Sequence, residues 1–294
     1  MRWTAIVNPG AGRRRRPRDL ARLTDALARR AVDIAVTRSA DEGVRVAQEA
    51  FDRGEGVLAC GGDGTVRVLA DAAAEVDGLL AIVPTGAGND FARALGLTHR
   101  EPLDALGVLD GGCETRVDLG RVVNASGQVL RFTTVAHSGL DGEVNRWANT
   151  VSCVSGTALY AMAALRTMAV YETTPMRVTV DATEWEGRPW LVAIANSRCY
   201  GGGMNIAPQA RTDDGLLDVV IVSDVSRAQL FVRFPHLMRG THLRIDGVRS
   251  LRGETVTIHG PTDQALYASG ERVGLLPAEI TALRAALRLL VPTR

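Results

Sequence analysis

The sequence contains no lysine. All 34 basic side chains of the 294-residue chain are arginines, set against 33 acidic side chains. Without lysine, the chain cannot use a Walker A lysine on nucleotide phosphates, the strand lysine of protein kinases, or a Schiff base to pyridoxal phosphate or a carbonyl substrate. Any phosphate that a cationic side chain holds must therefore be held by arginine, which is always charged and presents a planar fork of donors.

Aromatic residues, net charge and long apolar runs are also scarce. Aromatics make up 4% of the chain and the net charge is +1, so we expect no nucleic-acid partner. The longest stretch without a charged residue, 147–165, is too polar for a transmembrane helix. The N-terminus lacks a signal-peptide hydrophobic region, and the four widely spaced cysteines are typical of free, buried thiols. We therefore expect a cytoplasmic protein, either soluble or held peripherally on the inner membrane surface.

The first 95 residues alternate between strand and helix patterns. Short apolar runs predict strands at 3–7, 32–37, 57–60 and 79–83. Helical spacing of apolar residues separates these runs, and Ser39 with Glu42 forms a capping-box signature ahead of the second helix. Repeated strand–loop–helix units predict an α/β domain built on a doubly wound parallel sheet.

From about residue 113 the pattern changes to short strands joined by hairpin-like turns, which predicts an antiparallel sandwich or barrel. The expected strands are 115–123, 128–136, 176–180, 190–195, 217–222, 242–245 and 254–258, with a turn at 186–187 and one helix over 157–171. The tail 278–291 is ambiguous, because its leucine spacing favours a helix while its position suits a final strand. We expect a nucleotide-binding domain at 1–122 and a β-rich domain at 123–282, with 283–294 returning to the first.

Three glycine-rich loops follow three strands of the first domain. They span Asn8–Gly12, Gly61–Thr65 and Pro84–Asp90. Ligands of α/β sheets bind at the carboxyl ends of strands, where glycine lets phosphates approach the main chain and helix N-termini favour anions. Since two of the loops also carry aspartate, the sequence predicts a nucleotide–metal site.

The same loops resemble those of a known family. Gly61–Thr65 (GGDGT) resembles the signature shared by diacylglycerol and sphingosine kinases, NAD kinases and, more distantly, phosphofructokinases. Asn8–Gly12 resembles the NPxxG motif of the lipid-kinase branch, and Pro84–Arg93 resembles its P-x-G-T-x-N-D-F-A-R segment.

Three segments of the second domain extend this likeness. Tyr200–Met204 resembles the family's YGGGM segment, Asp213–Asp218 its DDGLLD segment, and Gly270–Pro277 its G-E-x-x-G-x-x-P segment. The motifs occur in the family's order along nearly the whole chain. The chain is therefore similar to soluble bacterial lipid kinases of the diacylglycerol kinase catalytic-domain family.

This resemblance implies an NAD-kinase-like α/β domain, a C-terminal β-sandwich domain, and ATP with Mg²⁺ as cofactors. The residues implied to bind the nucleotide are Asn8, Gly12, Arg13, Thr37, Gly61, Gly62, Asp63, Gly64, Thr65, Thr85, Gly86, Asn89 and Asp90. A structural Mg²⁺ is implied at the main-chain carbonyls of Arg211 and Leu216 and the carboxylate of Asp214, since oxygen ligands suit this ion. Glu271 is implied as the proton acceptor for the lipid hydroxyl, with Asp63 acting through Mg²⁺ or within the proton-accepting network.

Two positions depart from the family's pattern. Ala87 replaces a phosphate-contacting Thr, for which Thr85 could substitute, and Ser269 replaces the Asp that precedes Gly270 and Glu271. A serine without a partner is a weak base, so this change bears directly on activity.

Three functions follow from these residues. The first is a kinase that phosphorylates a lipid hydroxyl at the membrane surface, with diacylglycerol as substrate and phosphatidic acid as product. The second is a catalytically weak regulator that binds nucleotide or lipid. The third, NAD kinase, shares GGDGT but is disfavoured by the other motifs. A homodimer is left open, and the Arg13–Arg16 run is either a solvated loop or a site for phosphate or an anionic membrane.

Overall fold

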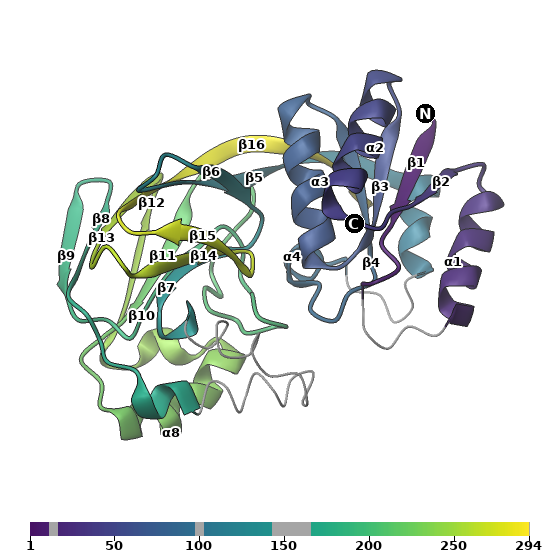
Figure 1. Ribbon diagram of the computed structural model, residues 1–294. Coiled ribbons are helices and arrows are strands. Elements are labelled where there is room, and N and C mark those ends of the chain that lie inside the picture. Colours follow the sequence, from purple (N-terminus) through teal and green to yellow (C-terminus); the bar gives the residue numbers. More distant parts are fainter. Residues whose placement is uncertain (12–16, 98–102, 143–165, 294) are drawn as a thin grey trace. The chain divides into compact units, whose positions relative to one another are not determined.

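The computed structural model describes residues 1–11, 17–97, 103–142 and 166–293. The chain divides into two compact units, one formed by residues 1–119 with 284–294 and the other by residues 120–283 (Figure 1). Gly12, the Arg13–Arg16 run and most of the helix predicted over 157–171 lie outside the described residues. The described end of that helix, 166–170, is helical.

The first unit contains a parallel sheet in the order β2-β1-β3-β4, to which the end of β16 adds in parallel beside β4. Its strands are β1 (Trp3–Val7), β2 (Asp33–Val36), β3 (Gly56–Gly61), β4 (Leu79–Pro84) and the end of β16 (Ala278–Pro292). Its helices are α1 (Pro17–Ala28), α2 (Ala40–Asp52), α3 (Asp63–Glu75), α4 (Asp90–Ala94), η1 (Asp104–Gly107) and α5 (Val108–Gly111). The predicted strands and helices of this unit are thus confirmed.

Helices cover both faces of this sheet because the side chains of its strands alternate. In β1, Ala5 and Val7 pack in one cluster with Leu23 of α1. Ile6 faces the other way, toward α2, where a Cβ added to Gly43 would lie 3.7 Å from Ile6 Cγ2. Strands buried on both faces are typical of parallel sheets, so the doubly wound fold predicted from the sequence is confirmed.

The predicted cap of α2 is half correct. Ser39 Oγ accepts a hydrogen bond from Glu42 N at 3.2 Å, as a capping box requires. The Glu42 carboxylate, however, accepts from Arg38 N at 2.7 Å, one residue before the cap. Both bonds satisfy backbone N–H groups at the helix start, so the signature located the helix correctly.

The second unit is an antiparallel β-sandwich, as predicted. One sheet has the order β12-β11-β10-β7-β14-β15, and the other contains β9, β8, β13 and the start of β16, with β5 pairing with β6. The strands are the end of β5 (Gly112–Asn124, whose residues up to 119 belong to the first unit), β6 (Val129–Phe132), β7 (Val135–Gly139), β8 (Met176–Val180), β9 (Thr183–Gly187), β10 (Leu191–Ala195), β11 (Leu217–Val222), β12 (Val248–Gly253), β13 (Thr255–His259), β14 (Ala265–Ala268) and β15 (Glu271–Leu275). The remaining elements are α8 (Arg227–Arg239) and η2 (His242–Arg244).

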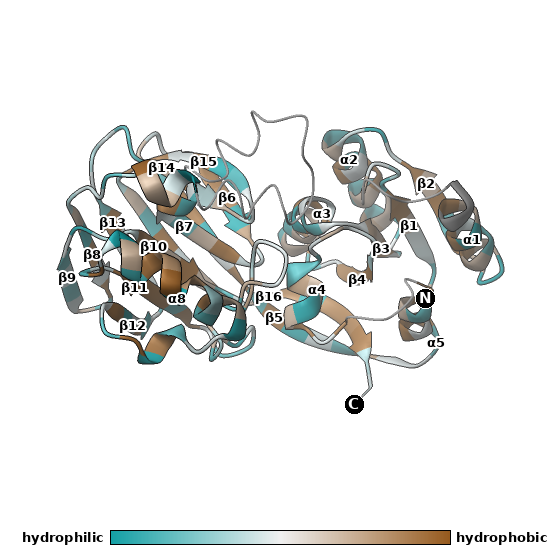
Figure 2. Cartoon of the chain, turned by 90° about the horizontal axis from the view of Figure 1, so that it is seen from below, coloured by the Kyte–Doolittle hydropathy of each residue, from teal (hydrophilic) through white to brown (hydrophobic). Residues whose placement is uncertain are grey.

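Strand β10 shows how the sandwich is filled. Val192 and Ile194 point into the main core between the two sheets. Ala193 points to the opposite face, where it packs in a cluster with Tyr200 and Ile206. Because β10 is buried on both faces, its sequence is a continuous apolar run (Figure 2).

Several expectations for this unit are wrong. Residues 186–187 end strand β9 rather than forming a turn, and the hairpin turn lies earlier, where Asp181 has φ 48°. This left-handed conformation usually requires glycine. Asp181 is stabilised in it because its carboxylate accepts hydrogen bonds from Glu254 N and Thr255 N. Residues 242–244 form a 3₁₀ helix instead of a strand. Helix α8 was not predicted, although Ser226 and Gln229 form a complete capping box at its start.

The C-terminal tail is a strand, so the helical interpretation of its spacing is wrong. Ile280 is buried in the first half of β16, and Leu287 and Leu289 are buried in the second. Between them Ala285 has φ 52°, and this left-handed residue switches which face the alternating side chains occupy. The buried positions therefore alternate with one parity before Ala285 and with the other parity after it. Taken together, the apolar residues of the two halves have a spacing that resembles that of a helix. Asp118 stabilises the switch, because its Oδ1 accepts from Ala285 N at 2.7 Å.

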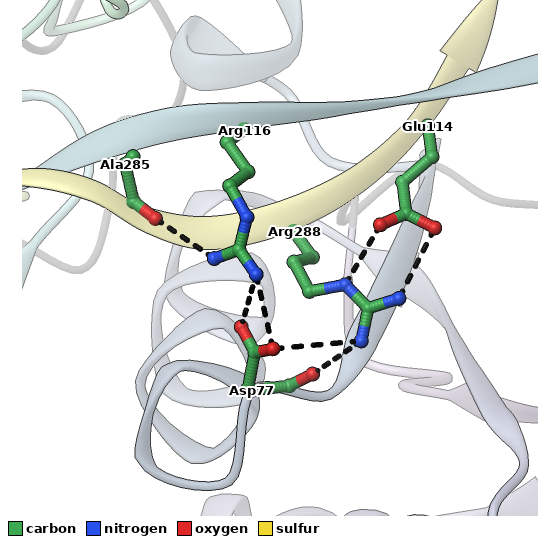
Figure 3. Close-up of polar contacts among 5 residues, drawn as sticks. All are labelled: Asp77, Glu114, Arg116, Ala285 and Arg288. Atoms are coloured by element: carbon green, nitrogen blue, oxygen red, sulfur yellow. Dashed lines mark hydrogen bonds and ion pairs between the residues drawn. The ribbon is translucent and has the colours of Figure 1, made fainter.

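Charged side chains hold the end of β16 within the first unit (Figure 3). Arg288 donates through two nitrogens to Glu114, at 2.8 and 3.1 Å, and to the Asp77 carbonyl oxygen at 2.8 Å. Arg116 pairs with the Asp77 carboxylate at 2.9 Å and donates to the Ala285 carbonyl oxygen at 3.1 Å. The Arg288 bonds lower the pKa of Glu114 and raise that of the guanidinium itself. Bidentate geometry and shared partners make such a network more stabilising than isolated surface pairs.

A buried carboxylate in the first unit predicts how stability depends on pH. Hydrogen bonds from Arg53 and Thr4 lower the pKa of Glu55 from its ordinary 4.5 to about 2. Since the folded pKa is depressed, this stabilisation is complete above pH 4.5 and is lost as the pH falls toward 2. We expect Glu55→Gln to lower the free energy of unfolding at pH 7 by about 1–2 kcal/mol and to flatten the acid limb.

Urea unfolding at a series of pH values measures this effect. Glu49→Gln is the matched control, because Glu49 pairs with Arg45 on the exposed surface of α2. If the free energy of unfolding falls equally steeply at acid pH in the wild type and in Glu55→Gln, Glu55 is not the cause of the pH dependence.

Candidate functional site

The three predicted loops meet at one edge of the parallel sheet. Asn8 N donates to the Cys60 carbonyl oxygen at 3.0 Å, and Thr85 N donates to the Gly61 carbonyl oxygen at 2.9 Å. The residues after β1, β3 and β4 are therefore neighbours, as parallel strands require. We call Asn8, Gly61–Thr65 and Thr85–Asp90 the glycine-rich edge.

Close backbone contact explains its glycines. A Cβ on Gly86 would lie 2.4 Å from Gly62 Cα, and one on Gly61 would lie 2.3 Å from Thr65 Cβ. No side chain fits at either place. Gly64, in contrast, is exposed and has no atom within 4 Å of where its Cβ would be. The space over this main chain at the start of α3 suits a phosphate group.

Asp63 joins the second loop to the third. It is the first residue of α3, and its Oδ1 accepts hydrogen bonds from Asp90 N at 2.6 Å and Phe91 N at 3.3 Å, at the start of α4. Burial raises the pKa of Asp63, and these backbone N–H bonds act in the opposite direction. The two bonds fix the orientation of the carboxylate, so it can present a second oxygen in a constant direction.

Two asparagines brace the other side chains. Asn8 Nδ2 donates to Thr65 Oγ1 at 2.9 Å while Asn8 Oδ1 accepts from Gly10 N. Asn89, at φ 51°, accepts from Gly86 N at 2.9 Å and donates to the Gly86 carbonyl oxygen at 2.8 Å. The side-chain amide of Asn8 thus positions Thr65, and that of Asn89 positions the third loop. Direct contacts of either asparagine with a nucleotide stay predictions.

Two of the three threonines assigned to the nucleotide are buried. Thr37 is 4% exposed and follows β2, and Thr85 is 5% exposed with a hydroxyl that has no hydrogen-bond partner among the described residues. Ala87 is exposed at the tip of the third loop. A phosphate contact by Thr85 stays a prediction that requires its loop to shift. Gly12 and Arg13, also assigned to the nucleotide, lie outside the described part of the chain.

In the second unit, Ser269 lies in a two-residue hairpin turn between β14 and β15. Ser269 and Gly270 have φ 47° and 82°, and Ala268 pairs with Glu271. Two consecutive left-handed residues define a type I′ turn, which favours Asn-Gly and Asp-Gly. Glu271 begins β15 and is exposed.

The Ser269 hydroxyl has donors that were not foreseen from the sequence. Its Oγ accepts from Thr133 N and Thr134 N, both at 3.3 Å, and lies 3.1 Å from Thr134 Oγ1. These threonines lie between β6 and β7, and only their position after an apolar run could have signalled this role. Two convergent backbone N–H groups form an environment that suits a carboxylate as well as a hydroxyl.

The carboxylate implied to bind a structural Mg²⁺ already holds a cation. Asp214 Oδ1 accepts from Leu216 N at 3.1 Å, and its Oδ2 pairs with the Arg252 guanidinium. Arg252 Nε also lies 3.6 Å from Asp218 Oδ2, while Arg211 pairs with a different side chain, Asp213.

A divalent ion at Asp214 would repel the Arg252 guanidinium where it now lies, and the Mg²⁺ site implied at Arg211, Asp214 and Leu216 stays a prediction. Within the described residues no group of three or more His, Cys, Asp or Glu side chains could hold a metal.

This arrangement predicts how Mg²⁺ affects stability. Without nucleotide, we expect the melting temperature of the wild type to be the same in excess Mg²⁺ and in chelator, because Arg252 neutralises Asp214. Arg252→Gln removes the guanidinium and leaves two carboxylates close together, so its melting temperature should fall by about 3 °C and rise again with Mg²⁺. Arg249→Gln, on the same strand, is the control. A wild-type midpoint that rises with Mg²⁺ alone would contradict this interpretation.

Two family models match the chain. The model described as "Diacylglycerol kinase catalytic domain" matches residues 2–122. The model described as "YegS C-terminal NAD kinase beta sandwich-like domain" matches residues 134–291. Together they include the glycine-rich edge and the Ser269 turn.

Similar proteins carry related names. A protein of Mycobacterium tuberculosis (strain CDC 1551 / Oshkosh) named "Diacylglycerol kinase" is 34% identical over 293 residues, which is 98% of this chain and 94% of that protein. A Pseudomonas aeruginosa PAO1 protein named "Probable lipid kinase YegS-like" is 38% identical over 199 residues, covering 66% and 63% of the two chains. A crystal structure of a diacylglycerol kinase from Bacillus anthracis superposes with a TM-score of 0.73 at 20% identity, covering 98% and 96%, which shows the shared fold.

Proposed function

Because the chain belongs to the diacylglycerol kinase catalytic-domain family, we propose that it transfers the γ-phosphoryl group of ATP to the hydroxyl of diacylglycerol, giving phosphatidic acid and ADP. The observation that carries this proposal is the glycine-rich edge, where three loops converge around the fixed carboxylate of Asp63. Phosphoryl transfer needs little covalent chemistry from the protein, so positioning and charge stabilisation are the functions to assign.

On the nucleotide side, the main chain around Gly64 holds phosphate at the positive end of the α3 dipole. Asn8 and Asn89 keep the flanking loops in register, as their hydrogen bonds show. If Mg²⁺ binds with the nucleotide, it would supply charge neutralisation at the phosphates, and Asp63 would offer it an oxygen ligand of the kind this ion prefers. Since the chain has no lysine, the charge of the phosphates must be stabilised by main-chain N–H groups, by a metal ion and by arginine.

On the acceptor side, a carboxylate must accept the proton of the lipid hydroxyl. Ser269 cannot do so directly, because a hydroxyl is a weak base and its oxygen already accepts hydrogen bonds from Thr133 N and Thr134 N. We assign the proton to Glu271, which follows the same turn and is exposed.

An acceptor competition tests the proposal. The full chain is supplied with labelled ATP, Mg²⁺, NAD and mixed micelles that contain diacylglycerol, and the labelled products are separated. We expect label in phosphatidic acid. Label in NADP would make the protein an NAD kinase, and ATP binding without transfer to any lipid would make it a regulator, as the absent carboxylate at Ser269 would explain.

The proposed substrate is a membrane lipid, so access to it is part of the proposal. In the described part of the chain no helix is long and apolar enough to cross a bilayer. We propose that the protein works in the cytoplasm and reaches diacylglycerol by peripheral contact with the membrane surface.

A further inference from the structure

Strand β2 has one open edge. It forms the end of the sheet order β2-β1-β3-β4, and in the described part of the chain no strand pairs with its outer edge. The four residues of β2 are exposed or half-buried, whereas β3 is buried throughout. Figure 2 shows β2 at the rim of the sheet, between α1 and α2. A row of backbone N–H and C=O groups at such an edge can pair with another strand.

The residues whose backbone groups point outward can be identified from the pairing with β1. Thr37 N donates to the Val7 carbonyl oxygen at 3.0 Å, so the backbone groups of Thr37 face β1. Alternate residues of a parallel strand turn their backbone groups toward the same neighbour, so those of Ala35 also face β1. The N–H and C=O groups of Ile34 and Val36 therefore point away from the sheet.

Ile34 and Val36 also carry exposed apolar side chains, which are 37% and 49% exposed. They are in register with Ala5 and Val7 of β1, which pack with Leu23 of α1, so both side chains lie on the α1 face of the sheet. Of the eight large apolar side chains that are exposed among the described residues, these two alone share a strand. Edge strands are usually protected by charge, proline or a bulge, and the segment from Ile34 to Val36 has none of these.

This edge is complementary to itself. A two-fold axis at Ala35 would place Ile34 opposite Val36 of a second copy, and Val36 opposite Ile34 of that copy. Both would be hydrogen-bonded pairs of an antiparallel ladder, because the backbone groups of both residues point outward. The same register brings the apolar side chains together on one face. A shift by one residue would instead set these outward groups against groups that already face β1.

The charges beside the strand favour the same orientation. With the axis at Ala35, residues 28–33 of one copy lie opposite residues 37–42 of the other. The first segment has two arginines and one aspartate, a net charge of +1. The second has one arginine, one aspartate and one glutamate, a net charge of −1. No like charges are directly opposed in this alignment, and Arg29 lies opposite Asp41.

We propose that a second copy of the chain covers this edge, so that two β2 strands pair antiparallel about Ala35 and join two parallel sheets into one. The two β2 strands run in opposite directions, so the glycine-rich edges point to opposite ends of the joined sheet. An extended segment of another protein could bond the same backbone groups, but the chain itself already supplies the match between Ile34 and Val36. Because the paired segment is short, the interface is small, and we expect a dissociation constant on the order of micromolar.

Sedimentation velocity of the full chain over a concentration series tests this pairing. We expect dimers of the wild type, and dimers about tenfold weaker for Ile34→Arg and for Val36→Glu, because the introduced charges of each homodimer become diagonal neighbours. Val129→Glu, on β6, is the matched control, because Val129 is 49% exposed, as Val36 is. It should dimerise as the wild type does. Thermal midpoints show whether each variant is folded, since changes at exposed positions alter stability little.

A mixture of the two charged variants tests the register. The arginine of the Ile34→Arg chain would face the glutamate of the Val36→Glu chain, while the remaining Val36 and Ile34 keep their contact. We therefore expect a heterodimer about tenfold tighter than either variant forms with itself. A fluorescent label on one variant allows the heterodimer to be followed in the same sedimentation experiment.

Three outcomes would overturn the proposal. The wild type could sediment as a monomer throughout the micromolar range, so that no second copy covers the edge. Ile34→Arg and Val36→Glu could dimerise as tightly as the wild type, which would place the interface elsewhere. Both variants could be folded monomers that do not associate when mixed, which would exclude the pairing of Ile34 with Val36.

Discussion

Asp63→Asn is expected to lower kcat by about 10³-fold, which corresponds to about 4 kcal/mol of transition-state stabilisation. The amide oxygen of asparagine can still accept the hydrogen bonds from Asp90 N and Phe91 N that join the second loop to the third. The substitution therefore removes the negative charge while keeping the geometry of the glycine-rich edge. Steady-state kinetics in diacylglycerol micelles measure the rate, and the thermal midpoint reports the fold.

The control for this prediction is Asp52→Asn, which removes an exposed carboxylate at the end of α2. We expect it to be as active as the wild type. An Asp63→Asn enzyme within about threefold of wild-type kcat would show that the Asp63 charge is not used in phosphoryl transfer.

Ser269→Asp is expected to raise kcat/KM by about 10²-fold, the usual contribution of a positioned general base. The type I′ turn at Ser269 and Gly270 accepts aspartate readily. The backbone N–H groups of Thr133 and Thr134 would bond one carboxylate oxygen, as they now bond the serine hydroxyl. The second oxygen would then be available to the substrate hydroxyl beside Glu271.

Ser269→Asn separates charge from turn geometry. Asparagine suits the same turn, so both variants should gain about 0.5–1 kcal/mol in free energy of unfolding. Only Ser269→Asp should gain rate. An equal rate gain in both variants would assign the effect to the turn, and no gain in either would show that the serine does not limit catalysis.

The first unit could be predicted from the sequence because its signals are local. Each strand of its sheet is a short apolar run, and glycines mark the loops at Gly61 and Gly86. The convergence of these loops followed from the rule that parallel strands end at one edge. The bonds that orient Asp63 came only from the structure, because the donors at Asp90 and Phe91 are distant in sequence.

The second unit was harder to predict because its decisive contacts are not local. The helical spacing of the tail is produced by a left-handed Ala285, which residue spacing alone cannot distinguish from a helix. The pairing of Arg252 with Asp214 depends on the register of β11 and β12, which sets Asp218 opposite Arg252. Helix α8 begins with a capping box at Ser226, but it also contains Pro235, a residue type that usually ends or kinks a helix.

The central claim is tested most directly by the stoichiometry of a single reaction. Purified full-length chain is incubated with γ-labelled ATP, Mg²⁺ and diacylglycerol micelles, and phosphatidic acid and ADP are quantified together. We predict one labelled phosphatidic acid for each ADP formed, and loss of both products in Asp63→Asn. Formation of ADP without labelled lipid, or the same yield of phosphatidic acid from Asp63→Asn, would contradict the proposal that the glycine-rich edge around Asp63 is the catalytic site of a lipid kinase.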